Sequence, residues 1–132
     1  MTGIKRRYEL VIPPDPTERV ATAEELAALR RVFDLTGVPA GDELRRQLQG
    51  LKVRTGCACG CATVDLVPPV DVPASSVTVQ EIRANVLGEG QAFVGFLLVF
   101  LKAGRLDRLE FATVAEDPIT VVPAPESLEF AE

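Results

Sequence analysis

Three cysteines form the only cluster in this sequence whose residue types and spacing suggest chemistry. Cys57, Cys59 and Cys61 alternate with alanine and glycine. In an extended strand, alternate side chains point to the same face, so the three thiols would share one face, which Thr63 and Asp65 would continue. Thiolates are typical zinc ligands, and this spacing therefore suggests a metal site as one interpretation.

The zinc interpretation lacks a complete set of ligands. A closed structural zinc site has four ligands, and the chain contains three cysteines and no histidine. A carboxylate such as Asp65, a water or a second chain would have to complete it. The segment Cys57-Ala58-Cys59-Gly60 resembles the start of the zinc-binding SEC-C motif, but the downstream ligand pair of that motif is missing. We therefore expect no cofactor and keep zinc as the alternative, with Cys57, Cys59, Cys61 and Asp65 as its candidate ligands.

Packing explains the cysteines more simply. Free cysteine behaves as a small and often buried apolar residue, and the neighbouring Ala62, Val64 and Leu66 suit a packed strand. We expect at least two of the three thiols to be buried. Thiol redox chemistry is a further alternative, although no two cysteines have the C-x-x-C spacing of thioredoxin-like sites.

Other catalytic patterns are missing from the sequence. Without histidine, no Ser–His or Cys–His nucleophile pair can form. Gly88-Glu89-Gly90 does not match a dinucleotide fingerprint, and no phosphate-binding P-loop pattern occurs. Asp65 could pair with Asp107 or Glu110, but nothing in their spacing favours a catalytic pair over solvated side chains. An enzyme is therefore not the preferred interpretation.

Length, composition and charge indicate a single domain. The chain has 132 residues, of which 47% are hydrophobic and 25% charged, as is usual for a globular protein. Its net charge of −5 disfavours nucleic acid as a partner. The longest apolar run, Ala92 to Leu101, is about half of the ~20 residues needed to span a bilayer, and the N-terminus lacks a signal-peptide pattern. We expect a cytoplasmic protein that does not bind membranes.

The first half of the chain predicts two helices. Thr22 and Glu25 form a capping-box pattern, an apolar stripe follows at helical spacing to about Leu35, and Gly37 suits a left-handed cap. A second, shorter helix is expected from about Asp42 to Gln49.

The second half predicts strands. The expected strands are Cys61 to Val67, Val77 to Leu87 with a bulge near Gln80 and Glu81, Ala92 to Leu101 with both faces buried, and Leu106 to Val114, with a short strand at Tyr8 to Ile12. Hairpin turns are expected at Gly88 to Gly90 and at Lys102 to Arg105.

Together these elements predict a two-layer α+β domain over residues 1–132, with the N-terminal helices packed on an antiparallel meander of four to five strands. Residues 1–7 and 115–132 are expected to be tail-like, although Leu128 and Phe130 could pack back on the body. The side chains expected in the core are Leu29, Phe33, Phe96, Leu98, Leu109 and Phe111.

The cysteine segment also resembles one found in small uncharacterised bacterial proteins. In those proteins a C-x-C-G-C segment runs into T-V-D-L, as Cys57 to Leu66 does here. An apolar strand, a glycine turn and a Leu-x-x-Leu-Glu-aromatic strand follow, matched here by residues 95–101, Gly104 and residues 106–111. The resemblance carries over no activity and no site residue.

The absence of catalytic patterns favours a binding function. We expect a small non-enzymatic domain that binds a protein partner, as bacterial immunity proteins do, because size and acidic charge fit that class. The alternative is a zinc- or thiol-dependent protein centred on Cys57, Cys59 and Cys61. The sequence leaves the oligomeric state open.

Overall fold

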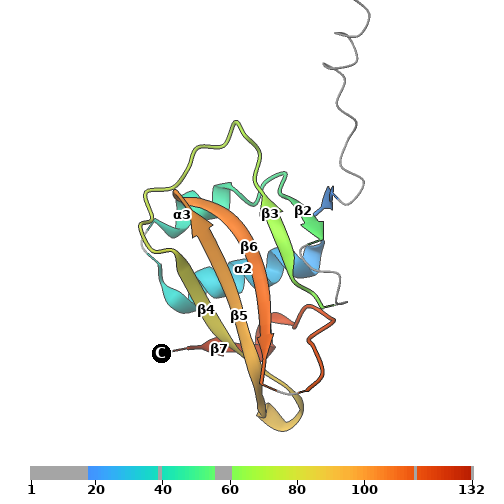
Figure 1. Ribbon diagram of the computed structural model, residues 1–132. Coiled ribbons are helices and arrows are strands. Elements are labelled where there is room, and N and C mark those ends of the chain that lie inside the picture. Colours follow the sequence, from blue (N-terminus) through green and yellow to red (C-terminus); the bar gives the residue numbers. More distant parts are fainter. Residues whose placement is uncertain (1–17, 39, 56–60, 115, 132) are drawn as a thin grey trace, which may run out of the picture.

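The described part of the chain forms two helices and a seven-stranded antiparallel sheet (Figure 1). The computed structural model describes residues 18–38, 40–55, 61–114 and 116–131. The strand expected at Tyr8 to Ile12 lies outside these residues. Both helices lie behind the sheet in Figure 1, so the fold has two layers.

The helices are α2 (Ala23–Thr36) and α3 (Gly41–Arg46), and the strands are β1 (Glu18–Val20), β2 (Lys52–Thr55), β3 (Val64–Val67), β4 (Glu81–Leu87), β5 (Phe93–Lys102), β6 (Arg105–Thr113) and β7 (Leu128–Phe130). Their order across the sheet is β1-β2-β3-β6-β5-β4-β7. The predicted α+β class is confirmed, but the predicted meander of four to five strands is wrong. The three strands that the sequence did not predict are β1, β2 and β7, which have only three or four residues each and are too short to show a clear alternating pattern.

Helix α2 begins and ends where its sequence predicts. The Glu25 backbone N–H donates to the Thr22 hydroxyl over 3.1 Å, and the Thr22 N–H donates to the Glu25 carboxylate over 2.9 Å. This reciprocal pair is a capping box, which satisfies backbone donors that have no partner inside the helix. Gly37 closes the helix in the left-handed region, with φ of 57°.

We expect Thr22→Ala to lower the free energy of unfolding by about 1 kcal/mol, because the first turn loses its side-chain acceptor. Urea denaturation checks this value. Thr36→Ala is the matched control, since Thr36 lies in the last turn and its hydroxyl donates to the Val32 carbonyl rather than capping an N–H. Equal effects of the two substitutions would contradict the role of Thr22.

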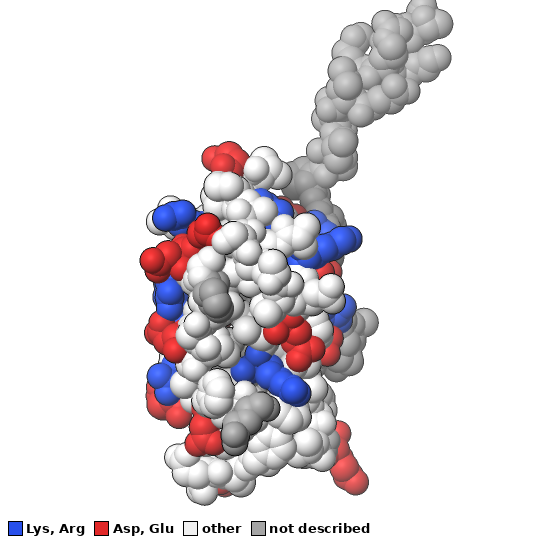
Figure 2. Space-filling model, turned by 90° about the vertical axis from the view of Figure 1, so that its left-hand side faces the viewer, with Lys and Arg blue, Asp and Glu red and all other residues white. Residues whose placement is uncertain are grey.

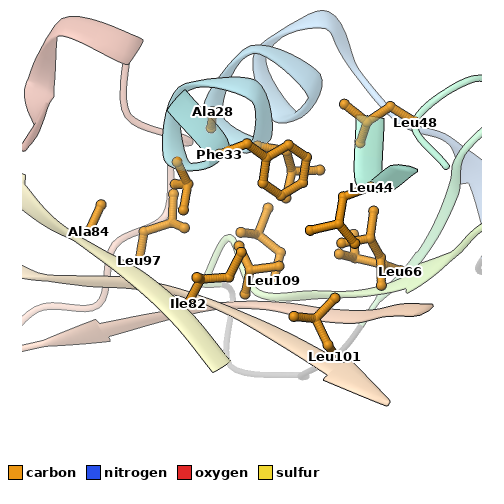
Figure 3. Packing of buried hydrophobic residues seen from close by; sticks show 14 of the residues in the cluster. Ala28, Phe33, Leu44, Leu48, Leu66, Ile82, Ala84, Leu97, Leu101 and Leu109 are labelled. Atoms are coloured by element: carbon orange, nitrogen blue, oxygen red, sulfur yellow. The ribbon is translucent and has the colours of Figure 1, made fainter. Parts of the chain in front are cut away.

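The core lies between α2 and the inner face of the sheet (Figure 3). The Phe33 ring points from α2 toward the sheet and is 2% exposed. Leu29 and Leu109 are fully buried and Phe111 is 7% exposed, so these four core predictions are confirmed. Helix α2 packs mainly over β4 and β7.

Strand β5 is buried on one face only, which corrects the prediction of two buried faces. Its helix-facing residues are Gly95, Leu97, Val99 and Leu101, all buried. Phe96 and Leu98 point to the other face and are half-buried rather than in the core. The cause is that α2 and α3 lie on one side of the sheet, so the other face of this apolar run is covered by no helix of the described residues.

Strand β4 also differs from its prediction. It begins at Glu81, and its register shift lies between Val86 and Leu87 instead of near Gln80 and Glu81. Both predicted hairpins are present, joining β4 to β5 and β5 to β6. At the C-terminal end, β7 pairs with β4, and Leu128 is 2% exposed.

A buried glutamine joins α3 to the β5–β6 hairpin. Gln47 has no exposed surface; its amide NH₂ donates to the Gly104 carbonyl over 2.9 Å, and its oxygen accepts from the Leu106 N–H over 2.8 Å. The N–H and hydroxyl of Ser75 donate to the same carbonyl over 2.9 and 2.8 Å. Ala103 and Gly104 both have positive φ, as a tight two-residue hairpin turn requires.

Candidate functional site

Cys61 is the one member of the cysteine cluster in the described part of the chain, since Cys57 and Cys59 lie outside it. It precedes β3, which begins at Val64, so the strand starts later than predicted. The Cys61 side chain is half-buried, and burial of at least two thiols stays a prediction.

Cys61 lines a groove of about 430 Å³ beside the first turn of α2. Segments far apart in the sequence form its walls: the residues around Thr22, the end of β2, the start of β3 and the stretch from Thr120 to Val122. The Ala62 N–H donates to the Ile119 carbonyl over 2.8 Å and ties two of these segments together.

Thr63 lies beside the Cys61 thiol and lowers its pKa. Hydrogen bonds from the Thr63 side chain and backbone hold the pKa of the Cys61 thiol below its ordinary value. Thr63 is itself 4% exposed, and its hydroxyl oxygen accepts from the Phe111 N–H over 3.0 Å. This shift favours the thiolate, the form that reacts and binds metals, relative to an ordinary cysteine.

An ion pair occupies the polar side of the groove. Arg19 donates to both oxygens of Glu25 over 2.9 Å, and the Glu25 side chain is only 3% exposed. Burial raises the pKa of Glu25, but hydrogen bonds from Arg19 and Thr22 outweigh it and leave that pKa below its usual range. With these partners Glu25 stabilises the helix start and is not a poised base. The sequence predicted the capping pair of Thr22 and Glu25, but it did not predict the ion pair of Glu25 with Arg19, which lies before the helix.

We expect the stabilising effect of Glu25 to depend on pH. Because its pKa is lower in the folded state, its contribution is present above the unfolded pKa of about 4.3 and is lost as the pH falls through the folded pKa. The stability difference between wild type and Glu25→Gln should be largest near pH 7 and shrink toward pH 3, as measured by urea denaturation. Glu24→Gln, on the exposed side of the same turn, should show a much smaller change.

Asp65 does not join Cys61 in the groove. It lies on β3, where Arg54 of β2 and Arg108 of β6 are its neighbours across the sheet. In the parts of the chain that the structure describes, no three Cys, Asp or Glu side chains are grouped to hold a metal. The proposed ligand set of Cys57, Cys59, Cys61 and Asp65 thus stays a prediction.

The second candidate site is the side of β4, β5 and β6 that faces away from the helices, which we call the open face. Along β5 it carries Phe96, Leu98 and Phe100, all half-buried. The Phe93 ring meets the Phe96 ring edge-on at 5.1 Å, and the Arg83 guanidinium lies 5.5 Å from the centre of the Phe96 ring. In Figure 1 no described helix lies in front of this face.

Charged residues border the apolar centre of the open face. Arg83 lies 3.9 Å from Glu81 along β4, and Arg108 lies 3.3 Å from Glu110 along β6. At the β5–β6 end, a shallow hollow of about 510 Å³ is lined by Phe100, Arg108 and Glu110 among others. Figure 2, viewed from the β4 side, shows both signs of charge interspersed with uncharged surface and no broad field of one sign.

Comparison with known proteins places the chain in no family: no family model, curated protein or solved structure matches it. Among the described helices, none has the length and apolar character needed to cross a bilayer.

Proposed function

We propose that this chain is a non-enzymatic protein-binding domain that acts through the open face of its sheet. The observation that carries the proposal is the apolar stripe of Phe96, Leu98 and Phe100 on the side of β5 away from the helices. An apolar centre rimmed by charged side chains is the common anatomy of protein interfaces. An immunity-type role, with a toxin as the partner, is the narrower form of this proposal.

The chemistry of the groove supports this choice over an enzyme. Its buried carboxylate, Glu25, is fully engaged by Arg19 and Thr22. The chain has no histidine to act as a general base for the Cys61 thiol. The open face, by contrast, presents large apolar side chains, and aromatic residues are enriched at the centres of protein interfaces.

Site-directed photo-crosslinking tests the proposal. A photoreactive phenylalanine analogue replaces Phe96 on the open face or, as control, Val70, which is 96% exposed on a loop. Adducts with a protein, foreign or a second copy, should form at position 96 and not at 70. The captured protein is then purified and titrated calorimetrically; Leu98→Arg should weaken its binding by about tenfold or more, and Val70→Arg should leave it unchanged. No position-specific adduct, or a partner indifferent to Leu98→Arg, would reject this function.

A zinc-dependent function is the second candidate, because Cys61 lines the groove and two further cysteines precede it closely in sequence. We expect purified protein to carry no stoichiometric zinc. Elemental analysis of protein prepared without a metal-chelating tag measures this directly. About one zinc per chain, with unfolding on chelation, would reverse the expectation, since a structural zinc contributes on the order of 10 kcal/mol to folding.

A further inference from the structure

We infer that the open face is covered in solution by the open face of a second copy of this chain, with the two β5 strands packed over each other about a two-fold axis. This inference rests on the proposed function and names its partner. What carries it is the arrangement of charges on either side of β5.

Four charged side chains border the stripe, two on each neighbouring strand: Glu81 and Arg83 on β4, and Arg108 and Glu110 on β6. We call residues that pair with one another across β4, β5 and β6 a row. In the row of Phe100, Glu81 and Arg108 lie on opposite sides of β5. In the row of Leu98, Arg83 and Glu110 do so. Each row thus has an acid on one side and a base on the other, and the sign reverses from one row to the next.

This pattern is complementary to itself. The two copies are related by a half-turn about an axis that is parallel to β5 and lies between the two open faces. This rotation leaves each row at the same height along β5, and it places the β6 side of one copy over the β4 side of the other. The second copy's Arg108 then lies opposite Glu81, and its Glu110 lies opposite Arg83. A two-fold interface uses one surface patch on both copies and therefore requires such self-complementarity.

The apolar centre fits the same arrangement. Each copy places Phe96, Leu98 and Phe100 against the same residues of the other, so the half-buried stripe becomes buried. Packed sheets lie about 10 Å apart with their mean strand directions within about 30° of each other, a range that includes the parallel β5 strands of this arrangement. The stripe from Phe96 to Phe100 is about 13 Å long at roughly 3.3 Å per residue, so the interface is small and the dimer should be weak and concentration-dependent.

Sedimentation velocity between about 10 and about 500 µM, a range suited to small interfaces, should show wild type passing from monomer to dimer. Leu98→Arg should weaken the dimer by about tenfold or more, since it places two like charges at the centre of the interface. Val70→Arg, on the exposed loop, should sediment as wild type.

Two charge-exchange variants test the geometry itself. Glu81→Arg/Arg83→Glu exchanges the signs on β4, and Arg108→Glu/Glu110→Arg exchanges them on β6. Each variant alone would place like charges opposite each other and should be monomeric. Mixed in equal amounts, the two should form a heterodimer, because each row then meets opposite charges again. A variant that had merely lost its fold would not be rescued by mixing.

The outcomes separate this inference from the proposed function. A wild type that stays monomeric to about 500 µM, or exchange variants that dimerise as wild type does, would overturn the two-fold pairing. The open face would then still be occupied if a foreign protein cross-links to position 96. Absence of every protein adduct at that position would reject the function as well.

Discussion

The substitution Gly104→Ala is expected to destabilise the domain by about 3 kcal/mol, through a backbone clash added to backbone strain. Gly104 has φ of +78°, where an alanine side chain is disfavoured. A Cβ atom at this position would also lie 2.2 Å from the Ser75 carbonyl oxygen, a backbone atom that cannot rotate away. The Ser75 N–H donates to the Gly104 carbonyl, so relieving the clash would break the bond that joins the two segments.

Gly90→Ala is the matched control for this prediction. Gly90 also has a positive φ, of +64°, but a Cβ there would meet no atom within 4 Å. Gly90→Ala should lower the free energy of unfolding by about 1 kcal/mol, which is the cost of the backbone strain alone. Urea denaturation of both variants isolates the clash as the difference between them. Equal losses would mean that the segment around Ser75 moves away from the hairpin without cost.

Gln47→Leu is expected to lower the free energy of unfolding by about 2 kcal/mol, because it leaves the buried Leu106 N–H without its acceptor. The Gly104 carbonyl loses one donor but keeps the two from Ser75. Leucine has nearly the volume of glutamine, so the loss reports mainly on hydrogen bonding.

Gln49→Leu provides the comparison, since Gln49 is exposed two residues further along. The free energy of unfolding of Gln49→Leu should stay within about 0.5 kcal/mol of the wild-type value, as is usual for substitutions at the surface. Amide hydrogen exchange gives a second readout: the Leu106 amide should exchange faster in Gln47→Leu and unchanged in Gln49→Leu. Unaltered protection of Leu106 would show that Gln47 does not hold the hairpin.

The elements predicted well are those whose signals are local. Thr22, Glu25 and Gly37 mark the ends of α2 through hydrogen bonds to residues only a few positions away. The strand count was not predictable in this way, because β1, β2 and β7 are strands only through their partners: β1 pairs with β2, β2 with β3, and β7 with β4. Segments of three or four residues are too short to show a periodic pattern of their own.

In the candidate sites, too, only the features with a local signal could be predicted. The thiol of Cys61 is visible in the sequence, but its neighbours Thr120 to Val122 come from almost sixty residues away and have no local signal. The open face was hidden because an unbroken apolar run predicts a strand buried on both faces. Which face of β5 the helices cover depends on tertiary packing, so Phe96 and Leu98 could not be assigned from their own segment.

The position of α2 has a consequence for how the protein is made. Helix α2 precedes β4 and β7 in the sequence, and it packs over both of these strands. A nascent chain therefore carries the apolar stripe of α2 before the strands that cover this stripe have been made. Contacts between such distant segments slow folding. The domain therefore cannot complete the packing of α2 until β7 has left the ribosome.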